Sequence, residues 1–155
     1  MTADLVQFLR SRLAEDEVVA RAADPELSHV FTRIETFDPE MAADERHIMR
    51  HRPARAQYEV VAKRLMLDEA LASRHLVTGD HYMDCPLVTE ADGVDTATAD
   101  RIRALNDDYR KEFGRGPECA ERCGRDPRVH RTLELLALPH VDHPDYMQAL
   151  TAGRA

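Results

Sequence analysis

The chain has 155 residues, the usual size of one domain, and its 21 basic and 29 acidic side chains give a net charge of −8. That charge disfavours general attraction to nucleic acid or to an anionic membrane, and no apolar run approaches the roughly 20 residues of a membrane span. With no Trp, four Phe and four Tyr, a core must be mainly aliphatic, which favours helices. We therefore expect a single cytoplasmic domain over residues 1–155.

Three helices are predicted before residue 50. Apolar residues at three- and four-residue steps predict a first helix over residues 2–23, which Asp24 and Pro25 should end because proline disrupts a helix interior. A short second helix should begin at Pro25 and end near Pro39. A third is predicted over residues 40–49.

The longest periodic segment begins at Pro53, which suits the first position of a helix, and ends near His75. Its apolar residues recur at helical spacing, as on the stripe of an amphipathic helix: Tyr58, Val61, Ala62, Leu65 and Ala72. Glycine, proline and aspartate residues then predict an irregular loop that carries Cys85.

Three further helices are predicted in the C-terminal half. One begins near Asp95 and stops at Gly114, one begins at Asp126 and ends before Pro139, and a short one follows Pro144. A second irregular segment with two cysteines separates the first two. The sequence thus predicts a mainly α fold, an irregular bundle of five or six helices with two Cys-bearing loops.

The three cysteines suggest a metal site. Cys119 and Cys123 lie four residues apart in the second irregular segment, and His130 follows in the next predicted helix. Short loops of this kind turn two thiolates towards one ion while a helix supplies a further ligand. Cys85, or His81 four residues before it, would complete the set. We therefore predict a structural zinc site of Cys85, Cys119, Cys123 and His130 that joins the two loops.

Two alternatives stay open for these cysteines. All three could be reduced, partly buried thiols without a ligand role, or Cys119 and Cys123 could form a redox pair if their loop folds tightly. A zinc ion with four protein ligands has no open coordination position. Metal binding here would therefore indicate architecture and not hydrolysis.

A second candidate site is the acid-free segment RHIMRHRPAR, residues 46–55, on an otherwise acidic protein. A helix that begins at Pro53 would add the positive end of its dipole. The zinc-protease motif HExxH is absent, because Ile48 occupies the position of the glutamate. The candidate anion-binding residues are Arg46, His47, Arg50, His51, Arg52 and Arg55. The alternative interpretation is that acidic side chains nearby neutralise the segment.

Three segments of the chain resemble the actinobacterial and actinophage family of unknown function DUF6221, in that family's order. They are DLVQFLRSRLAEDEVVARAA, RHIMRHRPARAQYEVVAKRLMLDEAL and TLELLALPHVDHPDY. The resemblance implies a small, mainly helical cytoplasmic protein with no assigned activity. It also implies cysteines between the long helix and the last segment, one of them two residues before Thr132, where this chain has His130.

These patterns favour a non-enzymatic accessory or regulatory protein that binds another protein, or forms a homo-oligomer, and that carries a structural zinc ion. The alternative is a small enzyme or metabolite-binding protein that holds an anionic ligand on residues 46–55. The nucleophile and phosphate-binding motifs GxSxG, GxxxxGK[ST] and GxGxxG are absent from the sequence. A nucleic-acid partner is disfavoured by the net charge.

Overall fold

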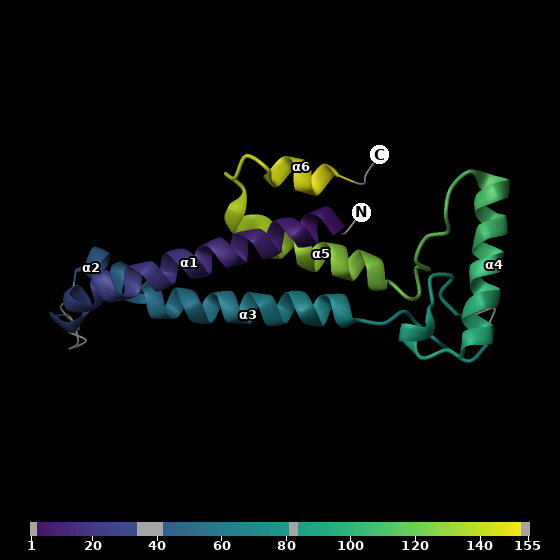
Figure 1. The fold of residues 1–155 in the computed structure, drawn as a ribbon, viewed down its shortest axis with the longest axis horizontal. Coiled ribbons are helices and arrows are strands. Elements are labelled where there is room, and N and C mark those ends of the chain that lie inside the picture. Colours follow the sequence, from purple (N-terminus) through teal and green to yellow (C-terminus); the bar gives the residue numbers. More distant parts are fainter. Residues whose placement is uncertain (1–2, 34–41, 81–83, 153–155) are drawn as a thin grey trace. The chain divides into compact units, whose positions relative to one another are not determined.

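The computed structural model describes residues 3–33, 42–80 and 84–152 (Figure 1). Within these ranges the chain forms six α-helices and two short 3-10 helices, and no strand. This confirms the predicted mainly α fold. The α-helices are α1 (Ala3–Arg33), α2 (Ala43–Arg50), α3 (Pro53–Ala72), α4 (Thr96–Phe113), α5 (Arg125–Ala137) and α6 (Tyr146–Thr151). The 3-10 helices are η1 (Glu90–Asp92) and η2 (Leu138–His140). None of the described helices has both the length and the apolar character that a bilayer crossing requires.

The first helix corrects the sequence prediction. α1 runs from Ala3 to Arg33 with Pro25 inside it, so the helix end predicted at Asp24 is wrong. A proline inside a helix removes one backbone hydrogen bond and costs about 3 kcal/mol. A helix of 31 residues keeps its bonds on both sides of that position, so one such loss does not end it. The end of the separate second helix, predicted near Pro39, lies outside the described residues.

Most other helix ends follow local signals in the sequence. α3 begins at Pro53 as predicted. Asp95 caps α4, since its side chain accepts a hydrogen bond from the backbone N–H of Thr98 at 2.9 Å. Gly114 ends α4 with a φ of 68°, a left-handed conformation that glycine adopts without strain.

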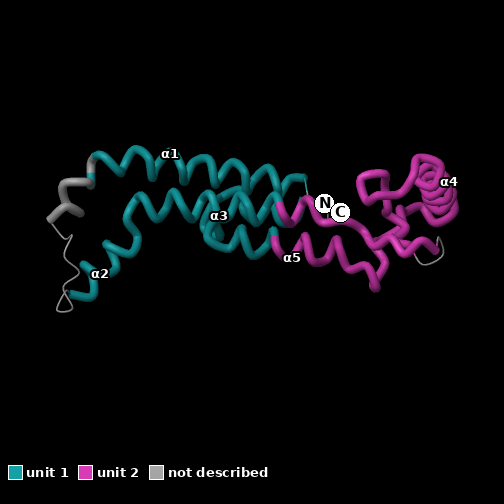
Figure 2. The backbone as a smooth tube through the Cα atoms, turned by 90° about the horizontal axis from the view of Figure 1, so that it is seen from below, with its two compact units in different colours: residues 1–68, 133–155 teal, residues 69–132 magenta. Residues whose placement is uncertain are grey.

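The chain divides into two compact units (Figure 2). Unit 1 comprises residues 1–68 and 133–155, and unit 2 comprises residues 69–132. The division does not test whether both units belong to one domain, so the single domain over residues 1–155 stays a prediction.

Unit 1 has an aliphatic core in which α1 and α3 lie side by side (Figures 1 and 2). Five leucines are at most 1% exposed: Leu5, Leu9, Leu13, Leu67 and Leu133. Burial of each contributes about 1.5–3 kcal/mol. α6 packs on α1, where the ring of Phe8 makes edge contacts with His140, His143 and Tyr146. The apolar residues at helical spacing near the start of α1, which are Leu5, Phe8, Leu9 and Leu13, are thus buried in this core.

The face of α3 that packs against this core is not the apolar stripe noted in the sequence. Its buried residues are Pro53, Val60 and Leu67. Tyr58, Val61 and Leu65, which belong to the stripe singled out in the sequence, are 76%, 52% and 65% exposed. α3 carries apolar side chains on two faces, so periodicity alone does not decide which face is buried.

Unit 2 has a smaller core built around cysteines. Its central cluster of buried residues consists of Cys85, Val88, Ile102 and Cys123. Half-buried side chains pack against it: Val77, Leu87, Val94, Cys119 and Ala120. The two predicted Cys-bearing loops therefore meet in the middle of one unit.

Candidate metal centre

Three cysteines and one histidine converge in unit 2. One ligand atom from each of His75, Cys85, Cys119 and Cys123 lies within 4.8 Å of the others. Nδ1 of His75 is 3.4, 3.8 and 3.7 Å from the Sγ atoms of Cys85, Cys119 and Cys123. The Sγ atoms of Cys85 and Cys119 are 3.8 Å apart.

These separations match the edges of a coordination tetrahedron. Sulfur ligands about 2.3 Å from a central zinc ion lie about 3.8 Å from one another at tetrahedral angles. For a sulfur and a nitrogen ligand, the corresponding edge is about 3.6 Å. The four side chains could therefore hold one metal ion without a rearrangement of their backbone.

Backbone hydrogen bonds hold the ligand segments together. The N–H of Cys85 donates to the carbonyl of Leu76 at 3.0 Å, which joins the first Cys-bearing loop to the segment after α3. The N–H of Leu76 in turn donates to Sγ of Cys123, at 3.2 Å. N–H groups of Cys123 and Gly124 both donate to the carbonyl of Ala120, which closes the turn between Cys119 and Cys123. The arrangement thus rests on main-chain geometry as well as on the side chains.

Two carboxylates orient His75. Its backbone N–H donates to Oδ1 of Asp92 at 2.6 Å, and its Nε2 lies 3.7 Å from Oδ1 of Asp126. Nδ1 therefore faces the thiols while Nε2 faces a carboxylate, as in metal sites where a carboxylate fixes the orientation of the ligating histidine.

Arg125 fixes that carboxylate and the chain next to it. Its Nη1 donates to Oδ1 of Asp126 at 2.7 Å. Its Nε and Nη2 donate to the carbonyls of Ser73 and Leu71, at 3.0 and 3.3 Å. One guanidinium thus ties the end of α3 to the first turn of α5, and His75 lies between them.

The thiols differ in acidity. Burial raises the pKa of Cys85 to about 11 against the effect of hydrogen bonds from backbone N–H groups. Burial also acts against ionisation of Cys123, but hydrogen bonds from the backbone N–H groups of Leu76 and Arg125, together with His75, lower its pKa to about 6. Cys123 is therefore ready to bind a cation as a thiolate, and a bound cation would also favour the thiolate of Cys85.

The family model for DUF6221, a family of unknown function, matches residues 2–150. The chain belongs to this family. Comparison with curated proteins and with solved structures gives no significant match. The family description assigns no activity, so function has to be inferred from the geometry of the molecule.

In this DUF6221 protein the predicted ligands are only partly brought together. Cys85, Cys119 and Cys123 meet as expected, but the histidine beside them is His75. His130 lies on α5 outside this group of four. His81 is outside the described residues. From the sequence, His75 was predicted only as the end of a helical segment and was missed as a ligand. Its position ten residues before Cys85 was the signal that could have identified it.

The predicted anion-binding segment lies on α2, the two residues after it and the first turn of α3, and its side chains are exposed or half-buried except for the buried Pro53. The rings of His47 and His51 are neighbours, with centroids 4.5 Å apart. Nε of Arg55 donates to Oε1 of Glu59 at 2.8 Å, so one arginine of the segment is paired with an acid as the alternative interpretation expects. Binding of an anion by Arg46, Arg50 and Arg52 stays a prediction.

His47 and His51 also line a cavity of about 590 Å³ in unit 1. Three carboxylates line it as well, those of Glu15, Asp16 and Glu59. The four arginines of residues 46–55 are absent from the described lining. Lys63 is the cation beside these three carboxylates in the described lining, so acidic groups outnumber it and the cavity gives an anionic ligand little support.

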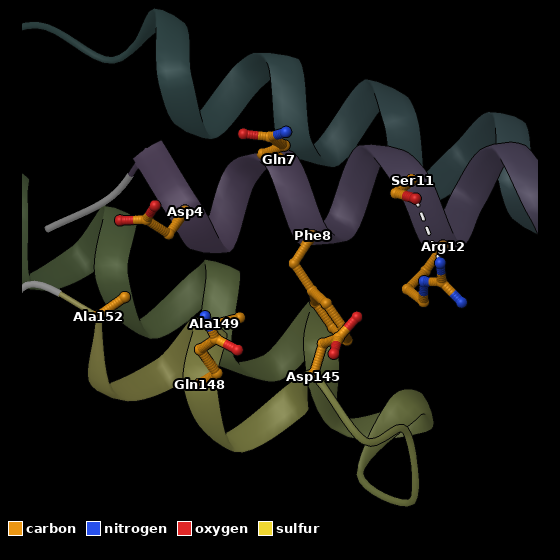
Figure 3. A pocket seen from close by; sticks show the side chains of 9 residues that line it. All are labelled: Asp4, Gln7, Phe8, Ser11, Arg12, Asp145, Gln148, Ala149 and Ala152. Atoms are coloured by element: carbon orange, nitrogen blue, oxygen red, sulfur yellow. Dashed lines mark hydrogen bonds between the residues drawn. The ribbon is translucent and has the colours of Figure 1, made fainter.

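A smaller cavity of about 370 Å³ is lined by residues of α1, of α6 and of the chain beside α6 (Figure 3). The carboxylates of Asp4 and Asp145 line it, together with Phe8 and Arg12. Nη1 of Arg12 contacts Nε2 of His143 at 2.7 Å, and its Nη2 donates to Ser11. The lining carries charges of both signs, so the cavity indicates no class of ligand.

Proposed function

We propose that this DUF6221 protein is a non-enzymatic accessory or regulatory protein in which one structural zinc ion holds unit 2 together. The observation that supports the metal is the convergence of His75 Nδ1 and three Sγ atoms at tetrahedral separations. Thiolates and imidazole suit zinc, whereas magnesium and calcium prefer oxygen ligands. A single ion also suits ligand atoms this close, because a cluster of several iron ions would hold its ligands farther apart.

The role of the metal is architectural. Four protein ligands leave zinc no open position for water or substrate. Val88 and Ile102 are the aliphatic members of the buried cluster in unit 2, and burial of each contributes only about 1.5–3 kcal/mol. Zinc bound at sites of this kind contributes roughly 10–16 kcal/mol of apparent folding free energy, so the ion would dominate the stability of this unit.

A reducing compartment suits this proposal. Cys85, Cys119 and Cys123 are all free cysteines, and metal binding requires thiolates rather than disulfides. The cytoplasm, as predicted from the sequence, would keep them reduced.

Protein binding is the second part of the proposal. Unit 1 exposes large apolar side chains on several helices, among them Val18, Tyr58, Leu65, Leu138 and Met147. Large apolar side chains exposed on these helices are candidate contacts with another protein. The alternative, an anionic metabolite bound by residues 46–55, has less support because carboxylates line the adjacent cavity.

The metal proposal is tested by elemental analysis of the full chain, purified without a His-tag under reducing conditions. We expect one zinc ion per chain, and a loss of zinc in Cys85→Ser and His75→Ala. The matched control is His130→Ala, which should keep the metal because His130 lies outside the group of four.

Substitution with cobalt(II) gives a second measurement that does not depend on variants. A tetrahedral site with three thiolates should show intense visible absorption and charge-transfer bands from sulfur. Fresh, reduced wild-type protein without stoichiometric metal, and without these bands on addition of cobalt, would overturn the proposal.

A further inference from the structure

α3 presents a regular stripe, apolar except at its C-terminal end, on a face that points away from the core of unit 1. Its residues are Ala54, Tyr58, Val61, Leu65 and Asp68, and we name this set the outer stripe. The spacing alternates between four and three residues, which is the a and d pattern of a coiled coil over two heptads. Tyr58, Val61 and Leu65 are each more than half exposed.

A second face of α3, about 120° around the helix axis from the outer stripe, already has its partners. Val60 and Leu67 are 3% and 1% exposed, and Pro53 is buried on the same face. Nη2 of Arg64 pairs with Oε2 of Glu17 on α1 at 2.6 Å, which fixes the rotation of α3 against α1. The helix is therefore formed and oriented before anything covers the outer stripe, so a partner would not have to offset the cost of helix formation.

The charges beside the outer stripe favour a second copy of the same stripe. Arg55 lies near its N-terminal end and Asp68 at its C-terminal end, about 20 Å apart along the helix axis at 1.5 Å per residue. Two stripes in antiparallel orientation place Arg55 of each copy near Asp68 of the other, twice by symmetry. Parallel stripes would instead place like charges together.

The side chains of the outer stripe also complement one another in the antiparallel orientation, where a positions face d positions. Val61 of one copy then faces Leu65 of the other, in two equivalent layers. Tyr58 faces Asp68, so its hydroxyl can donate to that carboxylate. The Arg55 side chain forms an ion pair with Glu59 of its own helix but is half exposed. It can therefore also reach the carboxylate of Asp68 in the other copy.

We propose that the outer stripe of α3 mediates an antiparallel homodimer. This inference rests on the protein-binding part of the proposed function and names its partner. It does not depend on the metal centre, which lies in unit 2.

The first experiment measures the molar mass of the full-length wild type by sedimentation equilibrium over a range of concentrations. We expect a concentration-dependent dimer, and a monomer for Leu65→Glu with unchanged helicity by circular dichroism. A wild type that stays monomeric at all concentrations, or a dimer that Leu65→Glu leaves intact, would overturn the inference.

Charge reversal tests the orientation and the identity of the partner. Arg55→Asp and Asp68→Arg should each raise the dimer dissociation constant at least about tenfold, because each places like charges together at both contacts. An equimolar mixture of the two variants should form a heterodimer with near wild-type affinity, since both contacts are then complementary. The matched control Arg10→Asp, on an exposed position of α1, should dimerise like the wild type.

Zinc content of the same samples separates this inference from the metal proposal. We expect one zinc ion per chain in every variant of the outer stripe. A monomer with full zinc content would overturn only the dimer, and a dimer without zinc would overturn only the metal centre. Mixed variants that fail to associate while the wild type dimerises would overturn the antiparallel arrangement.

Discussion

Unit 1 and unit 2 bury very different side chains. Among the residues that the structure describes, the largest fully buried side chains of unit 1 are five leucines, whereas in unit 2 the one member of that group is Cys85. Five leucines supply hydrophobic stabilisation directly, while a core centred on thiols supplies little of it. On the proposed function, one chain combines a unit stabilised by apolar burial with a unit whose stability depends on a bound metal ion.

Removal of the metal should have the largest effect and should act on unit 2 alone. We expect a chelator to abolish amide-exchange protection in residues 84–124 while the buried turns of α1 in unit 1 remain protected. Hydrogen exchange with mass spectrometry on the reduced protein measures both regions at once. Equal loss of protection in both units would show that the metal does not stabilise unit 2 selectively.

Truncation in the leucine core should have the complementary effect. Leu9 is fully buried, so Leu9→Ala should lower the free energy of unfolding by about 2–5 kcal/mol and leave zinc content unchanged. Chemical denaturation measures the first quantity and elemental analysis the second. The control Val18→Ala, on the same helix but 67% exposed, should change stability by less than about 0.5 kcal/mol. If Leu9→Ala lost zinc, the two units would not be stabilised independently.

The contact between Asp126 and His75 should tune the metal centre without being part of it. Asp126→Asn should lower zinc affinity by roughly 10- to 100-fold, because the carboxylate no longer orients the imidazole. Competition with a chromophoric chelator measures this affinity. Asp100→Asn, on an exposed position of α4, is the matched control, and an equal loss of affinity in both variants would contradict the role of Asp126.

The parts that could be predicted from the sequence depend on local signals. Proline at the start of α3, the aspartate cap of α4 and the glycine after it act within one helical turn, so residues 53, 95 and 114 mark helix ends correctly. Pro25 shows the limit of such rules. Its cost is local, but whether a helix continues through it depends on the packing of the whole helix.

The candidate site shows the same limit at the level of tertiary structure. Three cysteines in two loops already pointed to one site. The choice between His75 and His130 depends on the path of the chain after α3, which no spacing rule contains. The stripe of α3 correctly predicts a helix but does not identify its buried face, since Val60 and Leu67 form a second apolar face on the same helix.

The smallest predicted effect concerns the pH dependence of unit 1. Burial lowers the pKa of His140 below its usual value of 6.5, and Lys63, Arg12 and His143 act in the same direction, while Asp16 opposes them. Above pH 6.5 the imidazole is neutral in the folded and the unfolded protein, so its contribution to stability is fully present. As the pH falls below 6.5, the unfolded chain takes up a proton that the folded protein resists, and stability declines until the folded pKa is reached.

His140→Gln should therefore flatten the acid side of the stability profile of unit 1 between pH 7 and pH 5, measured as the thermal midpoint in a constant-ionic-strength buffer series. Because the ring of His140 packs against Phe8 at a centroid distance of 6.2 Å, the variant should also lose some stability at every pH. Only the change in slope reports the proton. The exposed His47, replaced in the same way, should leave the slope as it is. If the thermal midpoint of His140→Gln fell with pH as steeply as that of the wild type, protonation of His140 would not be the cause of the loss of stability in acid.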